Sequence, residues 1–78
     1  MWTEGAISVM GAKPGTVCHY WVKHFEEGSE CGIDNGRISK LMIKVGGQVT
    51  ANYDRGWDIK SKDSATKRAL AILLHEYN

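Results

Sequence analysis

The spacing of the apolar residues changes once along this chain, near Asp63. From there to the C-terminus they recur at intervals of three and four residues, which is the period of one helical face. The residues on that face are Ala65, Ala69, Ile72, Leu73 and Tyr77, flanked by Leu70 and Leu74. Asp63 or Ser64 can cap the start of this helix. Because a helix of about four turns is marginal by itself in water, its apolar face must pack against another element.

The part of the chain before this helix has the pattern of β-strands. Residues that alternate in polarity, or that are β-branched and aromatic, predict strands at residues 2–9, 17–25, 37–45 and 48–54. Glycine clusters at residues 11–15 and 46–47 mark turns, and Gly56 marks a bulge after which residues 57–59 continue the last strand. We therefore expect one α+β domain over residues 1–78, an antiparallel sheet of three to four strands with one C-terminal helix packed on one face (β-β-β-β-α).

The charge balance limits what such a small domain attracts. Ten Lys and Arg face nine Asp and Glu, a net charge of +1. No overall field draws the chain to a polyanion, so nucleic-acid binding would need charges that are segregated locally. The chain lacks an apolar stretch of the roughly 20 residues that cross a bilayer, and its first residues lack the regions of a signal peptide. We expect a cytoplasmic protein that makes no contact with membranes.

Thiols and imidazoles are present but poorly spaced for chemistry. Cys18 and His19 are adjacent, so on a strand they point to opposite faces. No C-x-x-C or H-x-x-x-H pair supplies two zinc ligands locally, and no local signature marks an activated cysteine. We expect no catalytic residue, no metal and no cofactor. A disulfide between Cys18 and Cys31 and two free thiols are both compatible with the sequence.

Two glycine-punctuated segments hold the candidate binding residues. Trp and Arg dominate the hot spots of protein interfaces, because a large ring excludes water and a guanidinium pairs with carboxylates. The candidate partner-binding residues are Arg37, Asp54, Arg55, Trp57 and Asp58, with Glu30 and Asp34 of the acidic loop as an adaptable rim. A structural role is the alternative, in which Trp57 covers the open end of the core and Arg55 pairs with a neighbouring aspartate across a bulge.

A second surface suits nucleic acid. Exposed aromatic rings interleaved with Lys and Arg are typical of proteins that bind nucleic-acid strands. The closest approach to that pattern is on the second and third predicted strands, at Trp21, Lys23, Lys40 and Lys44. Lysines that alternate with apolar residues are also typical of an ordinary solvent-facing strand. Nucleic acid is therefore the alternative partner to protein.

Two motifs, GIDNGRISKL at residues 32–41 and NYDRGWD at residues 52–58, resemble a group of short uncharacterised proteins. The group is identified with Gram-positive bacteria and their phages and mobile elements, and its members begin with a similar Met-Trp-x-x-Gly. The resemblance covers nearly the whole chain, although Cys31 stands where an aromatic residue is expected. It implies no activity. It implies that the two motifs define a shared surface, in a domain of unknown function with a mobile-element setting.

The expected function is non-catalytic protein binding. A small rigid module with a few anchors can inhibit a partner by steric occlusion, without a substrate pocket. The leading hypothesis is a phage or mobile-element inhibitor, similar in action to an anti-CRISPR protein, that docks onto a host defence or regulatory protein. Because a small sheet leaves edge strands and aromatic side chains exposed, we also expect a homodimer.

Overall fold

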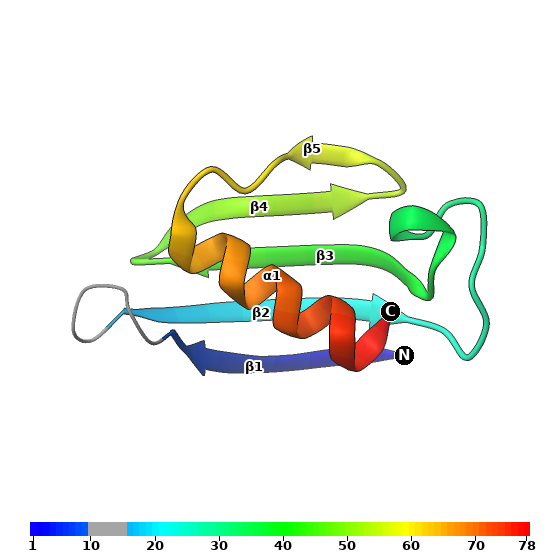
Figure 1. The fold of residues 1–78 in the computed structure, drawn as a ribbon, viewed down its shortest axis with the longest axis horizontal. Coiled ribbons are helices and arrows are strands. Elements are labelled where there is room, and N and C mark those ends of the chain that lie inside the picture. The colour runs from blue at the N-terminus through cyan, green and yellow to red at the C-terminus, as the bar shows by residue number, and fades with distance from the viewer. Residues whose placement is uncertain (10–15) are drawn as a thin grey trace.

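The computed structural model describes residues 1–9 and 16–78. An antiparallel sheet holds five strands in sequence order, and a helix lies across one face of it (Figure 1). The elements are β1 (Trp2–Ser8), β2 (Val17–His24), the short 3-10 helix η1 (Ile33–Asn35), β3 (Ile38–Val45), β4 (Gln48–Asp54), β5 (Trp57–Ile59) and α1 (Ser64–Tyr77). The predicted α+β architecture with one C-terminal helix is confirmed.

The turn expected at residues 11–15 lies outside the described residues. Within those residues, no helix has the length and apolar character needed to span a bilayer.

The expected number of strands, three to four, was wrong, because the sheet has five. Residues 57–59 do not continue β4 beyond a bulge; they turn back and pair with it antiparallel. The reversal uses Arg55, whose φ of 60° is left-handed. The Asp54 N–H donates to the Gly56 carbonyl at 2.9 Å and closes the turn. A left-handed residue followed by glycine makes a tight hairpin turn here.

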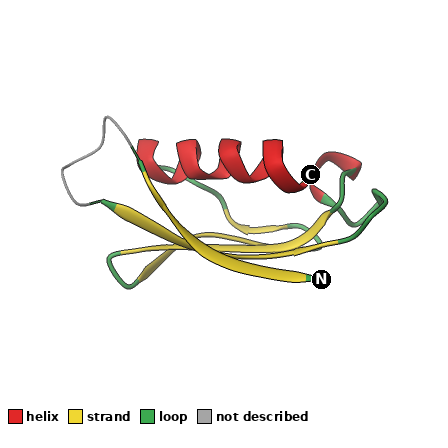
Figure 2. Cartoon of the chain, turned by 90° about the horizontal axis from the view of Figure 1, so that it is seen from below, coloured by secondary structure: helices red, strands yellow, loops and turns green. Residues whose placement is uncertain are grey.

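The core lies between α1 and the sheet (Figure 2). Its buried side chains come from both layers and from the β2–β3 connection: Cys18, Val22, Ile33, Ile38, Leu41, Ile43, Ala51, Tyr53, Ala65, Ala69 and Leu73. Asp63 is the N-cap of α1, because its carboxylate accepts a hydrogen bond from the Thr66 N–H at 2.9 Å. The buried helical face differs from the expected one. Ile72 is 45% exposed, whereas Thr66 is buried with its hydroxyl oxygen 2.8 Å from that of Thr50, so the start of the helix turns a polar side chain inward.

The long connection between β2 and β3 is anchored by the last residue of the chain. Asn78 Oδ1 accepts a hydrogen bond from the Ile38 N–H at 2.9 Å, and Asn78 Nδ2 donates to the Ile33 carbonyl at 3.0 Å. The Asn78 amide lies against Gly36, where any side chain would clash with it. The acidic connection is therefore fixed to the end of α1, and its arrangement depends on a contact 42 residues away in sequence, from Gly36 to Asn78.

Candidate functional site

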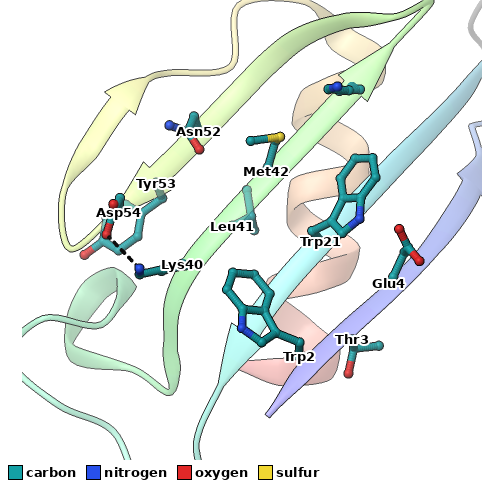
Figure 3. A pocket seen from close by; sticks show the side chains of 11 residues that line it. Trp2, Thr3, Glu4, Trp21, Lys40, Leu41, Met42, Asn52, Tyr53 and Asp54 are labelled. Carbon is teal, nitrogen blue, oxygen red and sulfur yellow. Dashed lines mark ion pairs between the residues drawn. The ribbon is translucent and has the colours of Figure 1, made fainter.

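The face of the sheet that is turned away from α1 carries rows of side chains from four strands (Figure 3). The strand register places Glu4 opposite Trp21, Trp21 opposite Met42 and Met42 opposite Asn52. The next row, two residues along each strand, consists of Trp2, Lys23, Lys40 and Asp54. Because side chains alternate between the two faces of a sheet, both rows point away from the core. These residues, together with Lys44, are termed the open face.

The open face is hollowed around two tryptophans. Most of the open-face residues line a concavity of about 800 Å³. The indoles of Trp2 and Trp21 and the side chain of Met42 lie in its middle, with charged groups such as Glu4 and Lys40 around them (Figure 3). Trp2 is 57% exposed, and indoles are highly buried on average in folded proteins. An apolar centre surrounded by a polar rim is the anatomy of a protein interface.

Two lysines lie over aromatic rings. Lys44 Nζ is 5.7 Å from the centroid of the Trp21 ring. Lys23 Nζ is 6.0 Å from the centroid of Trp2 and 5.6 Å from that of Phe25. A cation is attracted to the face of an aromatic ring, and such contacts contribute about 0.5–1 kcal/mol at exposed sites. The rings of the open face therefore carry positive charge close to their faces.

The charges of the open face have both signs. Lys40 Nζ lies 3.8 Å from Asp54 Oδ1, and both side chains are exposed by more than a third, so this ion pair adds little to stability. Glu4 faces the same concavity from β1. The lysines of β2 and β3 are thus bordered by carboxylates on β1 and β4. This arrangement differs from the single-sign groove that follows a polyanion backbone.

The structure brings together the residues predicted to bind nucleic acid. Trp21, Lys40 and Lys44 all line the concavity, and Lys23 lies opposite Lys40 in the strand register. Sequence reasoning missed the other members of the site, namely Trp2, Glu4, Met42 and Asn52. The alternation of side chains along each strand could have indicated them, because it shows which residues of that strand share a face of the sheet. The register between the four strands could not be predicted from the sequence, and it is this register that brings these residues together.

Three of the seven residues predicted to bind a protein partner, Asp54, Trp57 and Asp58, line one hollow of about 410 Å³, which shares Asn52 and Asp54 with the large concavity. The other four do not line it. Trp57 packs edge-on against Tyr53, with 5.1 Å between ring centroids, and is partly buried against the core. Asp58 accepts a hydrogen bond from the Asn52 side chain at 3.3 Å, and Arg55 forms the β4–β5 turn. This geometry supports the alternative for Trp57, in which the ring covers the end of the core.

The remaining predicted anchors are distributed around the same end of the molecule. Arg37 lines a separate hollow of about 280 Å³ with His24 and Phe25. Glu30 and Asp34 belong to the β2–β3 connection, where Asp34 has a φ of 50° within η1. Of the predicted protein-binding residues, Asp54 alone lines the large concavity.

Both cysteines are free thiols. Cys18 is buried, and its Sγ lies 3.8 Å from the Ala65 carbonyl oxygen. Burial raises the pKa of the Cys18 thiol, and the nearby Asp63 carboxylate adds to the effect, so the thiol is held in its protonated, weakly nucleophilic form. Cys31 is exposed. Among residues 1–9 and 16–78, no three His, Cys, Asp or Glu side chains are grouped so that they could hold a metal ion.

His24 is half-buried at the end of β2. Its Nε2 lies 3.0 Å from Thr3 Oγ1, and its ring is 4.8 Å from that of Tyr77 between centroids. Desolvation lowers the pKa of His24, and the positive charges of the N-terminus and Arg37 lower it further. The surroundings therefore favour a neutral imidazole that packs and accepts or donates a hydrogen bond.

Comparison with known proteins gives one family. A family model described as a domain of unknown function, DUF7678, matches residues 1–78. No curated protein and no solved structure matches the chain. The open face is consequently the starting point for its function.

Proposed function

We propose that this chain, which belongs to the DUF7678 family of domains of unknown function, is a non-catalytic module that binds another protein through the open face of its sheet. The supporting observation is the concavity of about 800 Å³ around Trp2, Trp21 and Met42. Aromatic residues and Met are enriched at the centres of protein interfaces, and clustered indoles form hot spots. A module of this kind acts by covering a surface of its partner.

The mixed rim favours protein over nucleic acid. Lys40 is paired with Asp54, and Glu4 lies on the same face, so a phosphate backbone would meet carboxylates at both borders. A protein surface, which carries both signs of charge itself, can complement such a rim. The net charge of +1 agrees with this preference.

Single-stranded nucleic acid is the second candidate. The observation in its favour is that Lys23, Lys40 and Lys44 share one sheet face with Trp21, and bases stack on aromatic rings flanked by cations. Binding of this kind would weaken steeply as salt is raised, because it releases condensed counterions.

The proposal includes a biological setting. We assign the chain to the cytoplasm of Gram-positive bacteria, carried by a phage or mobile element, where it inhibits a host defence or regulatory protein by steric occlusion. The motif resemblance supports the setting. The hydrogen bonds of Asn78 that hold the β2–β3 connection and the preformed concavity support occlusion, because a preorganised surface loses little entropy on binding.

Affinity capture from a host lysate tests the proposed function. The tagged chain is compared with a Trp2→Ala, Trp21→Ala variant, and each capture is made with and without nuclease. An Arg37→Ala, Arg55→Ala variant is the matched control, because it removes two large side chains outside the concavity. We expect one stoichiometric protein that survives nuclease, is lost with the tryptophan variant and is kept by the arginine variant.

Two results would change this conclusion. If the arginine variant loses the partner and the tryptophan variant retains it, the binding site lies at the β4–β5 turn and around Arg37, not on the open face. Recovery of nuclease-sensitive material alone would favour the second candidate. That candidate has a direct probe, a labelled single-stranded oligonucleotide of about 16 nucleotides, whose affinity should fall steeply between 50 and 200 mM salt.

A further inference from the structure

Strand β1 borders the sheet with a long, regular edge. Its seven residues pair with β2 without a shift in register, and in the part of the chain that the structure describes no strand pairs with its other side. β1 contains no Lys and no Pro, which are residues that protect sheet edges from pairing. At the opposite border, β5 has only three residues. The unprotected edge is therefore that of β1.

The direction of the backbone groups in β1 follows from one residue pair. The N-terminal ammonium of Met1 donates to the His24 carbonyl at 3.0 Å, and the His24 N–H donates to the Met1 carbonyl at 2.9 Å. Such doubly bonded pairs recur at every second residue of an antiparallel ladder. The residues of β1 that bond to β2 are consequently Thr3, Gly5 and Ile7. Those whose backbone groups face the free edge are Trp2, Glu4, Ala6 and Ser8.

We propose that this edge binds β1 of a second copy of the chain, antiparallel and about a two-fold axis at Gly5. Trp2 then exchanges hydrogen bonds with Ser8 of the partner subunit, and Glu4 does so with Ala6 of the partner subunit. Symmetry repeats both pairs, so every outward backbone group of β1 finds a partner. Two five-stranded sheets become one continuous sheet, with both helices on one side and both open faces on the other.

The charge and the length of β1 together select this register. Glu4 is its only charged residue, and it stands opposite Ala6 of the partner subunit, so like charges do not meet. A slip of two residues in one direction would place Glu4 opposite Glu4 of the partner subunit, which is destabilising, and would leave Ser8 unpaired. A slip in the other direction would leave Trp2 unpaired, so either slip shortens the ladder. The Gly5 pair occupies the close, non-hydrogen-bonded crossing at the axis. On the helix side of that strand the Tyr20 ring already covers Gly5, since a Cβ there would lie 2.6 Å from the Tyr20 hydroxyl oxygen.

Charge substitutions at Ala6 test both the dimer and its register. Ala6 is exposed, so neither variant disturbs the core. Ala6→Glu places like charges opposite each other twice, and Ala6→Lys places opposite charges there twice. We expect Ala6→Glu to raise the dimer dissociation constant, and Ala6→Lys to lower it, each by roughly 2- to 30-fold at low salt. Sedimentation velocity over a range of concentrations measures both. A shift of the two variants in the same direction would overturn the register.

A backbone substitution and hydrogen exchange test the edge itself. Ala6→Pro removes an outward N–H while leaving the bonds to β2, so a monomer with the wild-type circular dichroism spectrum is expected. In the wild-type chain, the amides of Glu4, Ala6 and Ser8 should become protected as concentration rises, whereas those of Thr3, Gly5 and Ile7 are protected throughout. A monomer at all concentrations up to about 1 mM, or a dimer that leaves the outward amides unprotected, would overturn the proposal. So would pairing of this edge with a strand of a different protein.

Discussion

Trp21 lies directly opposite Met42 across strands β2 and β3, on the face of the sheet that α1 leaves uncovered. The antiparallel register creates this pair, because the two residues lie 21 positions apart in the sequence, on different strands. An indole and a thioether are adaptable contact groups. Because Met42 lies at the middle of the open face, a substitution there distinguishes best between a protein partner and a nucleic-acid partner.

Opposite charges at Met42 distinguish the two candidate partners. A protein that buries the apolar centre should lose affinity for both Met42→Glu and Met42→Lys, by about 2 kcal/mol or more, because each leaves a charge unpaired in the interface. A nucleic acid should bind Met42→Lys more tightly and Met42→Glu less tightly. Isothermal titration with the captured partner and with the oligonucleotide measures both. Equal affinities for all three chains would place the partner away from this face.

The contact of Gly36 with Asn78 should behave as a coupled pair. Gly36→Ala is expected to lower the free energy of unfolding by about 1–3 kcal/mol, because its Cβ overlaps the Asn78 amide. Asn78→Ala removes two hydrogen bonds and should cost about 1–3 kcal/mol. In the Asn78→Ala background, Gly36→Ala should cost at least about 0.5 kcal/mol less than alone. Urea unfolding gives the three values, and strict additivity would show that the clash is relieved elsewhere.

The cap of α1 should depend on Asp63 and be insensitive to Ser64. The Asp63 carboxylate accepts from the Thr66 N–H at 2.9 Å and lies 2.8 Å from the Thr66 hydroxyl oxygen. Asp63→Ala is expected to lower the free energy of unfolding by about 1 kcal/mol, and Ser64→Ala, the control, to change it by less than about 0.5 kcal/mol. Thermal unfolding followed by circular dichroism separates these outcomes. An equal effect of both substitutions would contradict the assignment of the cap.

His24 should make the fold less stable in mild acid. Because desolvation lowers the pKa of His24 in the folded chain, the unfolded chain takes up the proton at a higher pH, so the free energy of unfolding declines as the pH falls through about 6.5. The pKa of Asp63 is also lowered, but protonation of this carboxylate changes the free energy of unfolding only below about pH 4. His24→Gln should flatten the dependence between about pH 7.5 and 5.5. Urea unfolding at several pH values checks this, and an unchanged slope in the variant would assign the effect to another group.

Much of the fold could be predicted from the sequence, because the patterns that mark its helix and strands are local. The change of apolar period located α1, and the acidic residue before it was the N-cap. The β4–β5 hairpin was missed because Gly56 is compatible with a bulge or a turn, and the left-handed φ of Arg55 has no sequence signature in a residue other than Gly or Asn. The exposure of Ile72 was missed because the rotation of a helix on its sheet is decided by packing.

The site was only partly readable for a related reason. β2 has large residues on both faces, so its sequence does not say whether the helix covers the face that bears Trp21 or the opposite face. Trp57 and Trp21 are equivalent as residue types, yet one packs on Tyr53 and the other lines the concavity. Charge and aromatic spacing predicted Trp21, Lys40 and Lys44 as a group. Trp2 and Met42 joined them only through the order and register of the strands.

The three tryptophans provide the most direct measurement of the central claim. Trp2 and Trp21 line the concavity. Trp57 does not line it but packs against Tyr53, which does, so its indole serves as an internal comparison at the border of the site. In a nitrogen-15 spectrum of the labelled chain, addition of the captured partner should shift or broaden the indole signals of Trp2 and Trp21 more than that of Trp57. A shift of Trp57 with Trp2 and Trp21 unmoved would contradict binding through the open face.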